Sequence, residues 1–153
     1  MCQHVKLGAH MKNIGYLAQD ISILHRQYYK DTREQFNQLE LNPTAACILL
    51  TIGDYPNITQ NHVARQLVVD KGLATREINK MEKLDYLTKQ NGVGKTKVLQ
   101  LTQLGSQVVE KIQKIRTDWW ENKFSETGLN SDSPLVSAIE TVVESFTAEE
   151  EID

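Results

Sequence analysis

The sequence predicts a mostly α-helical protein with one small β-hairpin, and three observations support this fold class. Apolar residues recur every three or four positions in several long stretches, which is the period of an amphipathic helix. Glycine and asparagine gather in one short turn, at residues 91–94, between two short stretches that suit strands. Thr59, Asp70 and Thr102 each precede a helical pattern and are good N-cap residues.

Two helices are predicted in the first third of the chain. Apolar residues at positions 14, 17, 18, 21, 24 and 28 form one stripe, so we expect a long helix from 14 to about 36. A second helix should begin at Asn42-Pro43-Thr44, because proline suits the first helical turn. It is apolar on most sides up to Ile52, which predicts that it is buried, and residues 53–57 should end it.

A tight helix-turn-helix is predicted next. Residues 58–67 read as a short helix capped by Thr59, with Val63, Ala64 and Leu67 on its buried side. His62 should be a polar residue of the first turn near this cap. Residues 68–70 are too few for anything but a tight turn between two helices.

The stretch from 69 to 87 contains the second helix of this pair. Ala74, Ile78 and Met81 recur at i, i+4 and i+7 and predict one apolar face. The opposite face is predicted to carry Gly72, Arg76, Asn79 and Lys83. Cations, an amide and a small residue suit contacts with phosphates and base edges, although a merely solvated helix face is the alternative.

A polar β-hairpin should follow. Residues 86–90 and 97–101 are the strand candidates, Asn91-Gly92-Val93-Gly94 is the turn, and Lys95 and Thr96 complete the tip. Helix, turn, helix and hairpin in this order make a winged helix-turn-helix.

Two more helices are predicted after the hairpin. Thr102 can cap a long helix to about residue 124, with Val108, Ile112, Ile115 and Trp119 as its stripe. A polar loop at 125–133 precedes a last helix from 134 to about 146. The stripes of the first and last two helices are too apolar for a chain of this size to bury alone, although a compact monomer could use some of them.

The distribution of charge favours nucleic acid, whereas the whole-chain charge of −3 does not. Residues 58–100 hold eight lysines and arginines against four aspartates and glutamates, a net charge of +4, so the rest of the chain carries −7. The positive charge therefore lies on the predicted winged module, as attraction to phosphate requires.

The ordered set of motifs resembles the winged-helix module of the MarR family of bacterial transcription regulators. The resemblance rests on ITQNHVARQL at 58–67, DKGLATREINKME at 70–82 and the Leu-Thr-x-x-Gly pattern at 101–105, and it extends to the flanking helices beyond about residue 12. Two departures stand out. The family's Asp-x-Arg in the wing is Val93-Gly94-Lys95 here, and the usual glycine between recognition helix and wing is Asp85.

The resemblance implies a homodimeric regulator of double-stranded DNA that acts on a pseudo-palindromic operator, most often as a repressor released by a small-molecule effector. It implies a helical dimerisation region at 11–40 and 103–148 and a winged helix-turn-helix domain at 41–102. The candidate DNA-binding residues are Gln60, Lys71, Gly72, Leu73, Thr75, Arg76, Asn79, Lys80, Lys89, Lys95 and Lys97. The alternative is a winged-helix module for protein–protein assembly, without sequence-specific DNA binding.

An aromatic effector could be held by tyrosines and tryptophans on the long helices, although such residues also serve as core or dimer interface. The candidates are Tyr16, Tyr28, Tyr29, Trp119 and Trp120. Cys47 stands among alanines and aliphatic residues, which favours a small buried hydrophobe over a redox sensor. His25, Cys47 and His62 lie on three different predicted helices without a close ligand pair, so no metal site and no cofactor are predicted.

Catalytic motifs are absent from the sequence, so we expect no enzyme activity. The apolar fraction of 40% is ordinary for a globular protein, and no apolar run approaches the 18 residues of a membrane span. Two distant cysteines and the lack of an apolar signal core favour the cytoplasm. Residues 8–11, Gly-Ala-His-Met, look like a cloning remnant, so 1–10 are predicted to be a tag or a disordered N-terminus, and 149–153 a frayed acidic tail.

Overall fold

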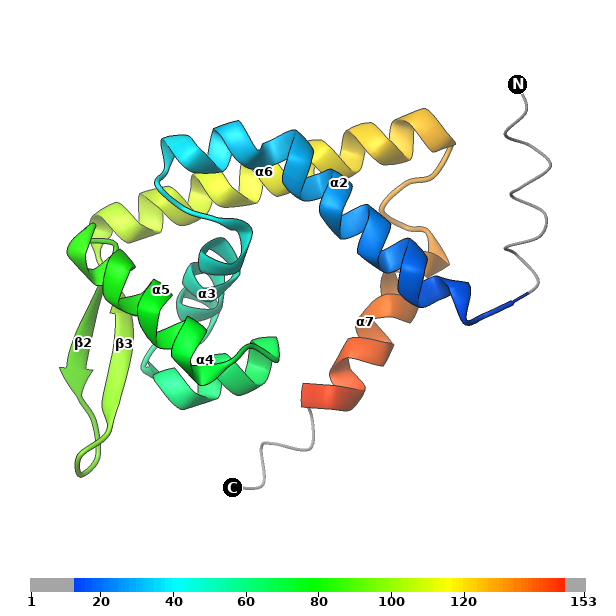
Figure 1. The fold of residues 1–153 in the computed structure, drawn as a ribbon. Helices are drawn as coiled ribbons and strands as arrows, with labels where there is room; N and C mark the ends of the chain where they lie inside the picture. Colours follow the sequence, from blue (N-terminus) through cyan, green and yellow to red (C-terminus); the bar gives the residue numbers. More distant parts are fainter. Residues whose placement is uncertain (1–12, 148–153) are drawn as a thin grey trace. The chain divides into compact units, whose positions relative to one another are not determined.

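The computed structural model describes residues 13–147 and divides into two compact units, with the boundary after residue 34. Each unit is described by itself. The expectations for the N-terminal tag and the acidic tail fall outside the described residues. The predicted fold class is confirmed, since helices predominate and a small antiparallel sheet accompanies them (Figure 1).

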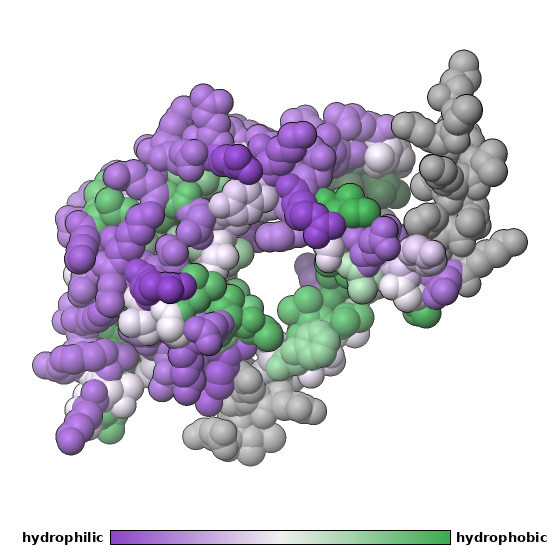
Figure 2. Space-filling model, viewed as in Figure 1, coloured by the Kyte–Doolittle hydropathy of each residue, from purple (hydrophilic) through white to green (hydrophobic). Residues whose placement is uncertain are grey.

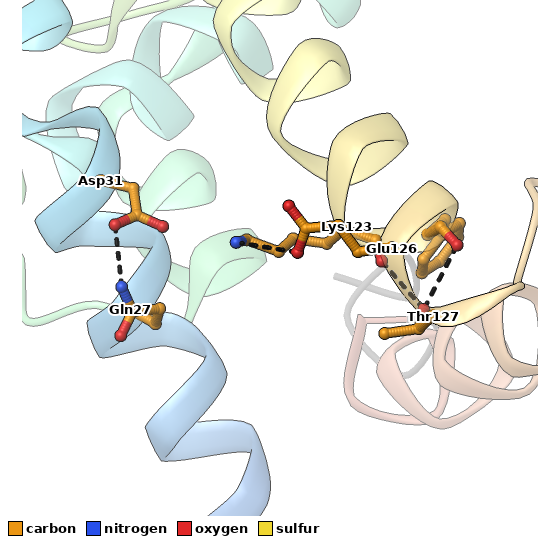
Figure 3. A network of polar contacts seen from close by, with 6 residues as sticks. Gln27, Asp31, Lys123, Glu126 and Thr127 are labelled. Atoms are coloured by element: carbon orange, nitrogen blue, oxygen red, sulfur yellow. Dashed lines mark hydrogen bonds and ion pairs between the residues drawn. The ribbon is translucent and has the colours of Figure 1, made fainter.

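The first unit contains most of helix α2 (Tyr16–Gln38), the long N-terminal helix expected from the sequence. Its apolar stripe lies at the surface, with Leu17 and Ile21 each 52% exposed. On its polar side, Nε2 of Gln27 donates a hydrogen bond to Oδ1 of Asp31 one turn later, at 2.8 Å (Figure 3). In the single chain, this apolar stripe is therefore exposed to solvent.

The second unit is built around α3 (Pro43–Asp54), which contacts the helices α4 (Gln60–Leu67), α5 (Lys71–Lys83) and α6 (Gln103–Thr127). The helix begins at the predicted place, and Asn42 caps it, because the Asn42 side chain accepts a hydrogen bond from the backbone N–H of Ala45 at 2.8 Å. Ile48, Leu49 and Ile52 of α3 are fully or almost fully buried. The helix ends at Asp54, two residues beyond the expected end.

The sheet has three antiparallel strands in the order β1-β3-β2, so the expectation of two strands was incomplete. The hairpin strands are β2 (Leu87–Asn91) and β3 (Lys97–Leu101), close to the predicted ranges. Strand β1 (Ile58–Thr59) pairs with β3 in the register Ile58 to Leu99, which ties the start of the helix-turn-helix to the wing. The helix predicted for 58–67 begins only at Gln60, behind its Thr59 cap, because residues 58 and 59 form the strand.

The junction between hairpin and α6 explains the Leu-Thr-x-x-Gly pattern. The Thr102 side chain accepts a hydrogen bond from the backbone N–H of Gly105 at 2.9 Å and so caps α6. The backbone N–H of Thr102 donates to the carbonyl of Tyr86 at 3.1 Å. A Cβ on residue 105 would lie only 1.9 Å from that carbonyl oxygen, so only glycine fits there.

Helix α6 continues to Thr127, three residues past the expected end. The Thr127 hydroxyl bonds to the carbonyls of Lys123 and Phe124, and Lys123 pairs with Glu126 at 3.5 Å (Figure 3). Gly128, at φ 75°, adopts the left-handed conformation that ends the helix.

The last helix, α7 (Pro134–Thr147), matches the predicted range and buries none of its residues. Its apolar side chains stand on the surface, as the green patch over this helix in Figure 2 shows. Phe146 is 62% exposed. Within residues 13–147, no helix is both long and apolar enough to cross a membrane.

Candidate nucleic-acid interface

Helix α5 separates a buried face from an exposed face as the sequence predicts. The carboxylate of Asp70 accepts hydrogen bonds from the backbone N–H groups of Gly72, at 2.8 Å, and Leu73, at 3.2 Å, and so caps the helix. Ala74, Ile78 and Met81 are fully buried. On the opposite side, the exposed residues are Lys71, Gly72, Arg76, Lys80 and Lys83, while Leu73, Thr75 and Asn79 are half-buried.

The first helix of the pair is fixed against α5 by a polar contact. Nε2 of Gln60, the first residue of α4, donates to Oγ1 of Thr75 at 2.6 Å. Thr75 in turn donates to the carbonyl of Lys71 one turn earlier, at 2.8 Å. The His62 backbone N–H donates to Thr59, in the first turn where His62 was expected.

The hairpin supplies three lysines, of which two have partners within the protein. Lys95 and Lys97 are exposed, and Nζ of Lys97 donates to Oδ1 of Asn91 on the facing strand. Lys89 is half-buried, and its Nζ donates to Oδ1 of Asn79 on α5. The same ammonium lies 3.7 Å from Oε1 of Glu82.

The predicted candidates thus lie on α4, α5 and the hairpin, and the structure brings Gln60 to Thr75 and Asn79 to Lys89. Whether any of them contacts DNA stays a prediction. The ion pair of Glu82 with Lys89 was not predicted from the sequence. The one sequence feature that points to it is the position of Glu82, three residues after Asn79 on the same helix face.

A second missed contact holds α5 against α3. Nδ2 of Asn42, the cap of α3, donates to Oε1 of Glu77 at 3.1 Å. Oε2 of Glu77 is buried without a hydrogen-bond partner among the described residues. This contact joins residues 35 positions apart, so no local sequence pattern predicts it.

The chain reaches the wing through a strained residue. Asp85 has φ 63°, in the left-handed region that glycine adopts without cost. The structure therefore explains why a glycine is usual at this place in the family that the sequence resembles. The Thr102 hydroxyl donates to the Asp85 carbonyl and helps to hold this conformation.

Cys47 is half-buried on α3 and has a free thiol. Burial raises the pKa of this thiol, and the charge of Arg116 opposes the shift only in part. A thiol that stays protonated is a weak nucleophile, which agrees with a packing role. Among residues 13–147, no three His, Cys, Asp or Glu side chains gather as a metal site.

A small open pocket of about 220 Å³ lies between the end of α2 and the middle of α6. It is lined by Gln35, Gln38, Leu39, Lys111, Lys114, Ile115 and Asp118. The five aromatic side chains considered for an effector pocket do not line it. Trp119 is buried, and its ring meets Trp120 edge-on, with the centroids 4.9 Å apart.

A helix-turn-helix followed by a basic hairpin defines a winged helix-turn-helix protein, and comparisons with known proteins agree. Residues 39–95 match the family model described as MarR family. A MarR transcriptional regulator from Methanosarcina mazei is similar in structure, with a TM-score of 0.72 and 21% identity over 92% of this chain and 94% of its own. No sequence among the curated proteins matches the chain.

Two further solved structures carry ligands. A putative MarR-family regulator from Listeria monocytogenes in complex with a 26-mer DNA has a TM-score of 0.71 and 24% identity, over 86% of this chain and 89% of its own. MarR from Staphylococcus aureus with salicylate and kanamycin has a TM-score of 0.71 and 18% identity, over 87% and 94%. The resemblance seen in the sequence is confirmed: residues 39–95 match the family model, and the chain has the fold of solved MarR-family transcriptional regulators.

Proposed function

We propose that this protein is a sequence-specific double-stranded DNA-binding transcription regulator that acts in the cytoplasm. The observation that carries the proposal is the outward face of α5, where Arg76 and Lys80 are exposed while the opposite face is fully buried. The N-terminal part of such a helix enters the major groove in helix-turn-helix proteins, with base edges within reach. The similar regulator bound to a 26-mer DNA supports the same use of the fold.

The alternative is a winged-helix module that binds proteins rather than DNA. It is favoured by the whole-chain charge of −3, since acidic proteins are repelled by phosphate. The net charge of +4 on residues 58–100 outweighs this argument, because electrostatic attraction depends on the charge nearest to the DNA.

The test is a gel shift with duplex DNA from upstream of the protein's own gene, against random DNA of equal length. We expect the operator to bind more tightly. Arg76→Ala should weaken operator binding roughly 5- to 150-fold, the loss of one good base contact of about 1–3 kcal/mol. Arg26→Ala, which removes an exposed arginine of α2, is the matched control and should bind like the parent. Equal binding by Arg76→Ala and the parent would show that α5 does not read DNA.

A homodimer is the assembly that we propose, on the argument that α2 and α7 leave apolar stripes exposed. Ile139 of α7 is 42% exposed although it is apolar. Light scattering should give twice the chain mass of 17.4 kDa. Ile139→Asp should dissociate the dimer, because burying an unpaired carboxylate is costly. Thr141→Asp, on the other side of α7, should not, and a stable parent monomer would contradict the assembly.

A dimer with two recognition helices should read a pseudo-palindrome whose half-sites lie about 10 bp apart, one turn of DNA. We further propose repression that is relieved by a small-molecule effector, aromatic or otherwise. The similar S. aureus protein with salicylate supports this choice of ligand class. Adding salicylate to the operator complex should raise its Kd, and benzyl alcohol is the control without a carboxylate.

A further inference from the structure

Two side-chain amides of the candidate DNA-binding surface have only one possible orientation each. The first belongs to Asn79, whose Oδ1 accepts a hydrogen bond from Nζ of Lys89. An ammonium group donates and never accepts, so the atom that faces it must be the carbonyl oxygen rather than the nitrogen. Glu82 lies 3.7 Å from the same ammonium, and the Lys89 side chain is only 25% exposed. Lys89 is thus engaged within the protein.

The second amide belongs to Gln60. The Thr75 hydroxyl has a single hydrogen, and it points to the carbonyl of Lys71, which only accepts. Gln60 must therefore be the donor in its 2.6 Å contact with Thr75 and must use Nε2. Within the part of the chain that the structure describes, neither Nδ2 of Asn79 nor Oε1 of Gln60 has a hydrogen-bond partner.

We propose that Lys89 and Thr75 are positioning residues that set these two amides in opposite senses for reading DNA. Asn79 then offers the two N–H donors of its Nδ2, and Gln60 offers the acceptor Oε1. This inference rests on the proposed function, since it names the chemistry that the same surface recognises.

The orientation of Asn79 changes the base that it prefers. An unconstrained asparagine binds adenine through two bonds, accepting from N6 with its oxygen and donating to N7 with its nitrogen. Lys89 occupies one of the two lone pairs of that oxygen and so weakens its acceptance from adenine N6, whereas the free N–H donors of Asn79 match the adjacent N7 and O6 acceptors of guanine. Oε1 of Gln60 matches the exocyclic amines of cytosine or adenine. The positive charge of Lys89 is paired with Glu82, so Lys89 does not act as a phosphate contact.

The test compares base preference and salt dependence in selections from random duplexes. Lys89→Met removes the ammonium and keeps the aliphatic chain. It should shift one position of each half-site from guanine toward adenine by at least about threefold, with the salt slope unchanged. Lys89→Arg keeps the donors and should restore guanine. Thr75→Val should relax the cytosine or adenine preference at a second position, whereas Thr75→Ser should not.

Lys95→Met is the matched control at the exposed hairpin tip. It should lower the salt slope by about one unit, weaken operator and random DNA by similar factors and leave the base preference intact. Lys89→Met behaving in this same way would identify Lys89 as a phosphate contact and overturn the proposal.

A measurement without DNA separates the two proposals. In an amide ¹H–¹⁵N spectrum, the side-chain NH₂ pair of Asn79, identified by its loss in Asn79→Ser, should move in Lys89→Met and stay in place in Lys95→Met. Unmoved signals would refute the positioning contact even if the protein binds its operator. Moved signals in a protein that binds no duplex would refute the DNA-reading function, and with it the base preference, but leave the contact standing.

Discussion

Gly105→Ala should destabilise the fold although alanine is the better helix former. Alanine gains up to about 1 kcal/mol over glycine within a helix. Against this, its Cβ would lie 1.9 Å from the Tyr86 carbonyl oxygen and 2.9 Å from the carbonyl carbon, so the backbone must move by more than 1 Å. Such overpacking costs typically about 1–3 kcal/mol or more, and losing the bond from Thr102 N–H to Tyr86 adds about 0.5–1.5 kcal/mol.

The net expectation is a fall of about 1–3 kcal/mol in the free energy of unfolding. Urea denaturation followed by circular dichroism measures it, at one protein concentration because dimerisation would shift the midpoint. Gly53→Ala is the control, since its Cβ would meet only side-chain atoms, Cδ1 of Leu101 at 3.2 Å and Cγ2 of Val109 at 4.0 Å, and no backbone. It should change stability by less than about 0.5 kcal/mol. Equal stabilities of the two variants would refute the role assigned to Gly105.

Three further outcomes follow from single residues. Asp85→Gly should raise the free energy of unfolding by about 0.5–1 kcal/mol. A left-handed non-glycine residue costs roughly 1–2 kcal/mol, and the added freedom of glycine in the unfolded chain offsets only part of this gain. The urea midpoints of the two proteins measure the difference. Asp70→Ala should lower it by about 1 kcal/mol through loss of the α5 cap, and Asp70→Ser should retain most of the parent stability. Burial raises the pKa of the Cys47 thiol, so the contribution of the neutral thiol to stability is complete below the pKa of an unfolded cysteine, about 8.5, and is lost as pH rises through the higher folded pKa. Cys47→Ala should therefore flatten the fall in urea midpoint as pH rises above about 8.5.

The sequence predicted the helices well because their signals are local. Each cap, such as Thr59 or Thr102, acts on a backbone N–H three residues away, and the stripe of α5 repeats within two turns. Strand β1 was not predicted because two residues are too few to show an alternation of apolar and polar side chains. They form a strand only by pairing with β3, some forty residues later in the chain.

The candidate interface was predictable as a surface but not as a set of contacts. The outward face of α5 follows from helical geometry once Ala74 is placed inside. That Lys89 turns toward Asn79 and Glu82 instead of solvent depends on how β2 lies against α5, which no spacing in the sequence encodes. The division into a dimerisation region and a winged domain stays a prediction.

The close fit of Gly105 to Tyr86 makes the start of α6 and the base of the hairpin a single joint. Tyr86 precedes β2 directly, and Thr102 separates β3 from α6, so both strands leave from the place where the helix is held. A five-residue strand is about 17 Å long, so a 10° rotation at this joint would carry the hairpin tip about 3 Å. A small tilt of α6 would therefore displace the hairpin tip, where Lys95 lies, much further than it displaces the base of the hairpin.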